Sequence, residues 1–138
     1  MNIVKNSVRY CLHDCVVNKI EIKDSNLILY LDKGIYEFDT DIGKYKIVEN
    51  CNIFMKINEL KEEEAYEHIS ISFFKKNTRK DISFNDFCEM VGKNSFRIYL
   101  DFYSYFAKSV LLKGYCNKAE IELLITEVND IQVIFTNK

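Results

Sequence analysis

Three side chains near the N-terminus have the chemistry of metal ligands. Cys11, His13 and Cys15 alternate along the chain, so in an extended segment they would project from one face. Two thiolates and an imidazole suit zinc, although the spacing is not a C-x-x-C pair and Cys51 or Cys116 would have to complete the site. A buried free cysteine also behaves as a small apolar side chain. We therefore expect no metal and no other cofactor.

The two histidines are the candidates for a general base. His13 precedes Asp14, but adjacent strand residues point to opposite faces, and only in a turn could this pair interact. His68 shares the polar side of a predicted strand with Ser70 and Ser72, yet no G-x-S-x-G turn surrounds either serine. We interpret the first pair as polar residues that fix the chain, and His68 as part of a solvated face. No catalytic residue is expected.

Glu49 interrupts the apolar side of the strand pattern between residues 45 and 57. Held among apolar side chains, it would be a candidate ligand-binding or catalytic acid, whereas a bulge that turns it outward is equally simple. An enzyme would depend on Glu49, His13 and His68 alone. The motifs G-x-x-x-x-G-K, G-x-G-x-x-G and H-E-x-x-H are absent, which disfavours nucleotide chemistry. We expect a protein that is not an enzyme.

The segment from Phe96 to Phe106 carries aromatic residues on both sides of a predicted strand. One side is apolar and should face the core: Phe96, Ile98, Leu100, Phe102 and Phe106. The other side mixes aromatic and charged residues: Arg97, Tyr99, Asp101, Tyr103 and Tyr105. Tyrosine and arginine are enriched at binding hot spots. We predict that this second side is a partner-binding strip, unless the helix or a loop covers it.

Two charged stretches lie between the predicted strands. Residues 75–80 carry four positive charges and could bind phosphate, but without aromatic neighbours in the same stretch they are typical of a solvated loop. The acidic run from 59 to 64, also predicted as a loop, would suit a basic partner.

Short strands joined by turns must position all these residues. Two-residue alternation predicts strands within 16–23, 27–31, 36–38, 45–57, 67–73, 96–106, 109–116, 119–128 and 131–136. One helix is predicted at 83–92, because Ser83 can cap it, Gly92 can end it, and an apolar stripe follows helical spacing: Phe84, Phe87, Cys88 and Val91. Such a short helix must pack on the sheet.

These elements predict a mainly β fold in one domain, residues 1–138. Short turns favour antiparallel pairing, and closure would remove exposed edges. We therefore expect a meander of about eight or nine strands curled into a barrel or half-barrel, with the helix as plug or lid. A two-layer sheet with a helix is the alternative.

Composition bounds the class of protein. The chain has 138 residues, 48% of them hydrophobic, a formal net charge of −2 and five cysteines, an odd number. This is a globular composition without a global field for nucleic acid or anionic lipid. The first seven residues lack the apolar run of a signal peptide, and no later window matches a membrane span. We expect a cytoplasmic protein that binds neither nucleic acid nor membrane.

A short segment near the N-terminus resembles the opening of a group of small bacterial β proteins. Leu12-His13-Asp14, followed by the predicted strands Val17–Ile22 and Leu27–Leu31, is similar to the opening of such proteins, some of which look like immunity proteins of polymorphic toxin systems. The resemblance covers about twenty residues and brings no catalytic residues with it. It implies a toxin as the partner.

The leading hypothesis is thus a non-enzymatic protein-binding module, of the immunity type if the resemblance holds. The alternative is a carrier of small apolar ligands, with a cavity lined by Phe73, Phe102 and Phe135 under the helix. An enzyme of unknown class is third. Pairing of an exposed edge strand with a second copy is also open.

Overall fold

The computed structural model describes residues 2–5 and 8–136, which form three antiparallel sheets. The largest has six strands, in the order β10 (Thr78–Asp81), β9 (Ile69–Lys75), β13 (Ala119–Ile125), β12 (Ser109–Cys116), β11 (Phe96–Ser104) and β3 (Val16–Val17). The second has four, in the order β14 (Asp130–Phe135), β8 (Cys51–Lys56), β5 (Asn26–Leu31) and β4 (Lys19–Lys23). The third also has four, in the order β1 (Asn2–Lys5), β2 (Val8–Cys11), β6 (Ile35–Asp39) and β7 (Lys44–Val48).

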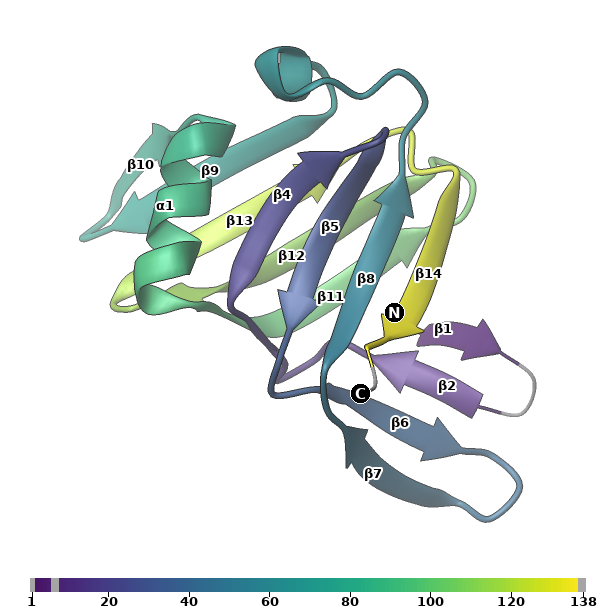
Figure 1. Ribbon diagram of the computed structural model, residues 1–138. Coiled ribbons are helices and arrows are strands. Elements are labelled where there is room, and N and C mark those ends of the chain that lie inside the picture. The colour runs from purple at the N-terminus through teal and green to yellow at the C-terminus, as the bar shows by residue number, and fades with distance from the viewer. Residues whose placement is uncertain (1, 6–7, 137–138) are drawn as a thin grey trace.

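The four-stranded sheet that contains β5 and β8 packs face to face on the six-stranded sheet, while the third sheet projects from one end (Figure 1). Alternate residues of both sheets point into the space between them and are buried there, among them Leu29, Ile53, Met55, Leu112 and Leu123. Burying each such side chain contributes about 1.5–3 kcal/mol. The apolar residues at every second position of the sequence therefore mark the side of each strand that packs against the facing sheet.

The mainly β, antiparallel character is confirmed, but the barrel is wrong. Among the described residues no sheet closes on itself, and each of the two packed sheets keeps two edge strands. The chain is not a simple meander either, because β8 pairs with β5 and β14, and β9 pairs with β13. Crossing between layers lets two open sheets bury one face each, so closure is not needed to form a core.

The predicted helix is present as α1 (Phe84–Asn94). The Ser83 hydroxyl accepts a hydrogen bond from the Asp86 backbone N–H at 3.1 Å, as an N-cap does. Phe84, Phe87 and Val91 are buried on the side that faces the sheets, so α1 packs across one end of the sandwich. Its position follows from the cap and the apolar stripe together.

The helix runs beyond the predicted end. Gly92 lies within it, and Asn94 is its last residue. Ser95 follows with φ of 63°, and its N–H donates to the Val91 carbonyl at 2.8 Å. The residue with positive φ that ends the helix is thus Ser95, whereas the sequence predicted Gly92 for this role.

Two predicted strands are each divided between sheets. The segment 16–23 splits at Asn18, whose side chain accepts a hydrogen bond from the Asp32 N–H at 2.9 Å. The segment 45–57 splits at Asn50, where φ is 56°. Glu49 lies exposed at this junction rather than among core residues. These splits, with the additional strands β1, β2 and β10, explain why the count exceeds eight or nine.

Two predicted loops are partly ordered. The acidic run enters a short 3-10 helix, η1 (Glu62–Glu67), in which Ala65 is buried. The basic stretch supplies β10, an exposed edge strand that pairs with β9 through a two-residue turn at Lys76 and Asn77. Both turn residues have positive φ, as this tight hairpin turn requires.

A candidate binding face on the six-stranded sheet

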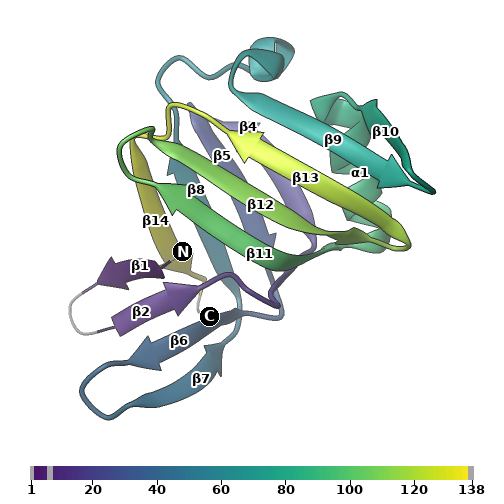
Figure 2. The ribbon, with the colours of Figure 1, turned by 180° about the vertical axis from the view of Figure 1, so that it is seen from behind.

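The outer face of the six-stranded sheet is the side turned away from the four-stranded sheet. Figure 2 shows this face toward the viewer, with α1 and the four-stranded sheet behind it. Within the described part of the chain, no other element lies over it. A sheet face left open in this way exposes every second side chain of its strands.

Strand register orders the outward side chains of this face into three rows. The apolar row contains Phe102, Leu111, Leu124 and Ser70. The charged row contains Leu100, Lys113, Glu122, Ser72 and Asp81. The aromatic row contains Arg97, Tyr115, Glu120, Phe74 and Arg79.

A bulge in β11 decides which residues reach the outer face. Ile98 pairs with Gly114 and Leu100 with Lys113, so Tyr99 is an extra residue in β11. Because of this extra residue, each side chain of β11 beyond Tyr99 points to the opposite side of the sheet from the one that uninterrupted alternation predicts. Asp101 and Tyr103 consequently lie opposite the buried residues Leu112 and Val110.

The predicted strip of five residues is therefore not one surface. Arg97 and Tyr99 lie on the outer face, and Tyr105 lies in the turn after β11. Asp101 and Tyr103 are half-buried on the inner side, where Tyr103 packs against the core. Sequence parity cannot reveal this, because no residue type marks the bulge at Tyr99.

The predicted core face of the same strand is corrected by the same bulge. Phe96 and Ile98, which precede it, are buried. Leu100 and Phe102, which follow it, are 38% and 58% exposed, and Phe106 in the turn is fully exposed. Residues assigned to the core thus belong to the surface.

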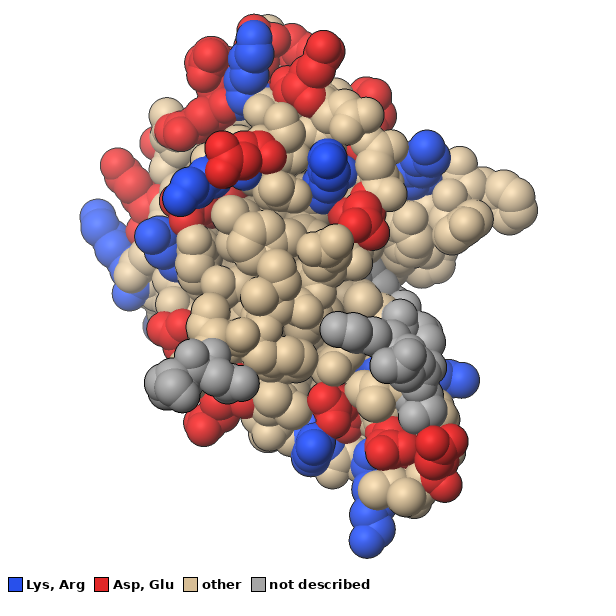
Figure 3. All heavy atoms as spheres, turned by 45° about the vertical axis from the view of Figure 1, so that its right-hand side comes forward, with Lys and Arg blue, Asp and Glu red and all other residues tan. Residues whose placement is uncertain are grey.

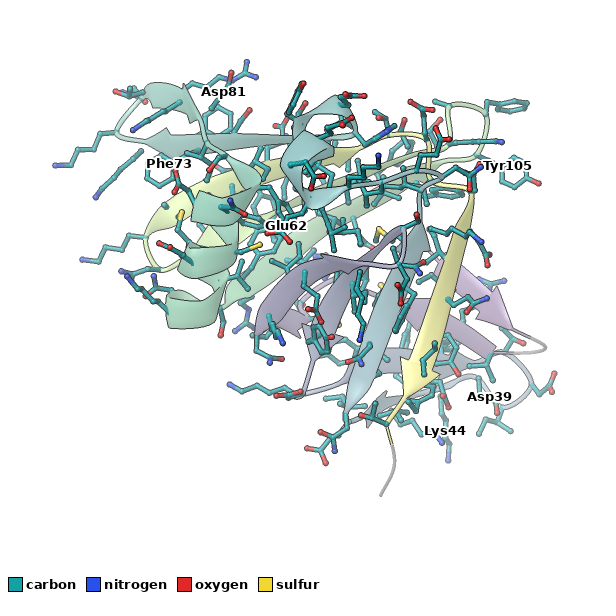
Figure 4. All side chains as sticks on the ribbon, turned by 45° about the horizontal axis from the view of Figure 1, so that its top comes forward. Asp39, Lys44, Glu62, Phe73, Asp81 and Tyr105 are labelled. Carbon is teal, nitrogen blue, oxygen red and sulfur yellow. The ribbon has the colours of Figure 1, made fainter. Side chains whose placement is uncertain are left out.

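The turn between β11 and β12 forms an aromatic tip at one end of the outer face. It carries Tyr105, 79% exposed, beside Phe106, with ring centroids 6.5 Å apart. Figure 4 shows Tyr105 pointing away from the body of the molecule, and Figure 3 shows this turn as a tan lobe. Leu124, 40% exposed, continues the apolar surface onto the sheet. We call Phe102, Tyr105, Phe106 and Leu124 the tip patch.

The opposite end of the outer face combines aromatic rings with charges. The Tyr99 and Tyr115 rings lie 5.3 Å apart, and the Tyr99 hydroxyl donates a hydrogen bond to the Glu120 carboxylate. This hydrogen bond, with desolvation and the charge of Glu120, raises the pKa of Tyr99 to about 12. The Arg79 guanidinium lies 6.0 Å from the centre of the Phe74 ring.

The charged row separates these two ends. Lys113 and Glu122 form an ion pair at 3.4 Å, and both side chains are about one third exposed. At the edge of the sheet, the Arg79 guanidinium donates to the Ser72 hydroxyl at 3.1 Å. These pairings satisfy the polar groups in the middle of the face within the sheet itself.

The residues considered for zinc do not share a face. Residues 12–15 form a turn, in which the Cys15 N–H donates to the Leu12 carbonyl at 3.0 Å. Cys15 is buried, its thiol donates to the Cys11 carbonyl at 3.3 Å, and burial raises its pKa to about 11. In the described residues, no three His, Cys, Asp or Glu side chains are grouped to hold a metal.

The residues considered for catalysis are dispersed. The turn brings His13 and Asp14 together at the surface, where His13 Nδ1 lies 3.2 Å from Asp14 Oδ2. His68 Nδ1 lies 3.3 Å from a Glu127 carboxylate oxygen, next to η1. Figure 1 places η1 and the β7–β8 junction, which contains Glu49, at opposite ends of the molecule. The three residues on which an enzyme would depend therefore form no common site.

The phenylalanines proposed to line a ligand cavity also separate. Phe73 and Phe135 are half-buried against the core, where the Phe135 ring lies 5.6 Å from that of Tyr10. Phe102 is on the outer face. The cavity lining predicted from sequence is therefore wrong.

No family model matches the chain, and neither a curated protein nor a solved structure matches it significantly. In the part of the chain that the structure describes, no helix is long and apolar enough to cross a membrane.

Proposed function

We propose that the protein is a non-enzymatic binding module that contacts another protein through the tip patch. The observation that carries this proposal is the complete exposure of Phe106 beside Tyr105, at a turn continuous with Phe102 and Leu124. Fully burying a phenylalanine side chain contributes about 1.5–3 kcal/mol. Contiguous apolar surface of this kind marks interaction sites in soluble proteins.

The composition of the tip patch favours a protein as partner. Phenylalanine and tyrosine are enriched at the centres of protein interfaces, where charged residues are depleted. Lys108, in the same turn, and the ion pair of Lys113 with Glu122 would lie at the rim. A toxin held in an inactive complex, as the resemblance to immunity proteins implies, is the partner we propose.

A second exposed apolar region lies on the β6–β7 hairpin and gives the proposal its competitor. Tyr45 is 70% exposed and Ile47 55% exposed there. These residues alternate with lysines, and the Lys46 ammonium pairs with Glu37 at 3.3 Å. The tip patch has no such charges between its aromatic residues, so we place the interface at the tip.

Site-specific photocrosslinking in the source cell tests this assignment. A photoreactive residue at position 106 should form a discrete protein adduct, whereas one at position 66 should not. Tyr66 is a suitable control because it is 76% exposed on η1, away from the tip. The protein found in the adduct should also co-purify with the wild type. It should be lost from a Phe102→Ser/Phe106→Ser variant and retained by Tyr66→Ser.

The same experiment has outcomes that contradict the proposal. A third photoreactive position, at Tyr45, tests the competing surface: a discrete adduct there but not at 106 would move the interface to the β6–β7 hairpin. An adduct between two copies of this chain would show that the tip patch binds a second copy and not another protein. Equal labelling of the same proteins at positions 66 and 106 would show non-specific contact, and the proposal would be wrong.

A further inference from the structure

The aromatic end of the outer face is hollowed. A depression of about 460 Å³ lies between the β9–β10 turn and the β12–β13 turn, which Figures 1 and 2 both show at the same end of the sheet. Phe74 and Tyr115 line it from either side, and Glu120 lies between them. Lys75, Lys76, Asn77 and Lys118 complete the lining.

The strands that carry the two aromatic residues are far enough apart to admit a flat ring between them. Phe74 is on β9, Glu120 on β13 and Tyr115 on β12, so the two rings start from strands two positions apart. At about 4.8 Å per strand, their backbones are about 10 Å apart. A planar ring in contact with both needs about 7 Å, at roughly 3.5 Å per face. Tyr115 is 47% exposed, so part of its ring stays accessible beside Tyr99, whose ring centroid lies 5.3 Å away.

The lysines around the depression are available to an anion. Among the ion pairs of the described residues, none involves Lys75, Lys76 or Lys118. Lys76 lies at the tip of the β9–β10 turn and Lys118 in the β12–β13 turn, so they approach the depression from separate hairpins. Three lysines and one glutamate line the depression, so this end has a local positive excess that the total charge of −2 conceals.

Glu120 provides a directional hydrogen-bond acceptor between the rings. The Tyr99 hydroxyl occupies one position on its carboxylate and holds the group in place. An ionised carboxylate offers about four lone-pair sites, so others remain for a ligand. A carboxylate recognises the exocyclic amino group of a nucleobase, which a keto oxygen at the same position cannot replace.

We propose that this depression binds a nucleotide unit, either free or within a single-stranded nucleic acid. The base stacks between Phe74 and Tyr115, an exocyclic amino group donates to Glu120, and the phosphate contacts Lys76 and Lys118. Stacking platforms beside a basic groove are the usual means of binding single strands. The basic stretch 75–80 lacks enough aromatic neighbours in sequence, and the fold supplies Tyr115 from another hairpin.

This site differs from the usual phosphate loops. The chain lacks their glycine-rich motifs. Its basic and acidic residues nearly balance, so the net charge by itself predicts no nucleic-acid partner. The proposal depends instead on side chains from three strands and two turns. It is also independent of the tip patch, because the charged row lies between the two surfaces.

Calorimetric titration of the full chain tests the site with cytidine monophosphate, uridine monophosphate, a cytosine-only oligonucleotide and a uracil-only oligonucleotide. Cytosine ligands should bind more tightly than uracil ligands, because only cytosine presents an amino group. Tighter binding of the oligonucleotide than of the monophosphate identifies a single strand as the source, whereas equal binding identifies a free nucleotide. Binding of the oligonucleotide should weaken with salt, with a log–log slope of about −1.4 for the two lysines that contact phosphate.

Matched variants give the expected size of each contact. Tyr115→Ala should weaken binding about tenfold, the loss of one stacking partner, while Tyr66→Ala should not change it. Lys76→Ala/Lys118→Ala should reduce the salt slope by about 1.4. Glu120→Gln can still accept from Tyr99 but should lose the preference for cytosine over uracil. Thermal unfolding shows whether each variant is folded.

Several results would overturn the proposal. Absence of saturable binding by the wild type at millimolar nucleotide would do so, as would equal binding of inorganic phosphate and nucleotide. Unchanged affinity in the folded Tyr115→Ala variant would exclude stacking at this site. Phe106→Ser should bind nucleotide normally, so failure of the tip-patch interface and failure of this site are separate outcomes.

Discussion

The two ends of the outer face are built from the same strands but differ in chemistry. At the β11–β12 turn, Phe106 is fully exposed and its neighbours are apolar. At the other end, Tyr115 and Phe74 lie on either side of Glu120, which accepts the hydrogen bond of Tyr99, and lysines line the same depression. The first surface suits an apolar partner with little directionality, and the second suits a flat, charged ligand.

The difference shows how one backbone irregularity assigns residues to surfaces. Before the bulge, β11 places Arg97 beside Tyr115 on the outer face. After the bulge, it places Phe102 there and turns Tyr103 toward the core. Without the extra residue Tyr99, the tip patch would lose Phe102 and the core would lose Tyr103.

The largest effect is expected at Gly114 of β12, which lies against the β11 backbone next to the bulge. A Cβ at Gly114 would lie 2.1 Å from the Arg97 carbonyl oxygen, so Gly114→Val must push the strands apart. We expect a loss of about 3 kcal/mol in the free energy of unfolding, measured with urea, and disturbance of both ends together.

Gly92→Ala is the matched control for that substitution. Gly92 is inside α1 and exposed, with open space around its Cβ position, so alanine should raise stability by about 1 kcal/mol. If Gly114→Val were as stable as the wild type, the close pairing of β11 with β12 at Ile98 would be wrong.

A pair of tyrosine substitutions distinguishes the inner side of β11 from its turn. Tyr103→Ala should cost about 2 kcal/mol, because Tyr103 packs against the core. Tyr105→Ala should change the free energy of unfolding by less than about 0.5 kcal/mol, because its side chain is 79% exposed. Equal losses of stability in denaturant titrations would show that Tyr103 and Tyr105 lie on one surface, as the alternation of the sequence predicts, and would contradict the reversal at the bulge.

The smallest effect is a pH dependence at the aromatic end. The pKa of Tyr99 is raised from 10.0 to about 12, chiefly by its hydrogen bond to Glu120, so the folded state holds this proton more tightly. Stability should therefore fall as pH rises through this window, since the unfolded chain binds fewer protons there. Tyr99→Phe should lose less stability over the same window than the wild type.

An exposed tyrosine provides the reference for this measurement. Tyr66→Phe should follow the wild type, and unfolding of all three proteins should be compared relative to neutral pH. A Tyr99→Phe profile parallel to that of the wild type would show that the hydrogen bond to Glu120 contributes nothing to folding.

Local features of the fold were predictable because they depend on neighbours in sequence. Ser83 and the stripe of Phe84, Phe87 and Val91 locate α1, since capping and helical periodicity act within a few residues. The strand 109–116 is predicted with its observed bounds because its alternation is uninterrupted. At the candidate site, the sequence predicted a binding strip that included Tyr99 and Tyr105, and the structure places these two residues at opposite ends of the outer face.

Long-range pairing was less accessible. The pattern from 45 to 57 is a single alternation, yet Cys51 begins a strand of another sheet and Glu49 lies at the exposed junction. The basic stretch 75–80 gave no sign that Tyr115 would lie next to it. These outcomes depend on which strands pair, and strand pairing is set by the packing of both layers at once.

By itself the sequence determined that the chain is mainly β and antiparallel, where its helix lies, and which segments alternate. It could do so because propensity, capping and periodicity are local. The tertiary structure alone decided that two open sheets pack face to face, that the bulge at Tyr99 reverses the end of β11, and that lysines from two turns meet around Glu120. The physical reason is that burial selects strand pairings between distant residues, and a single extra residue exchanges the two faces of everything beyond it.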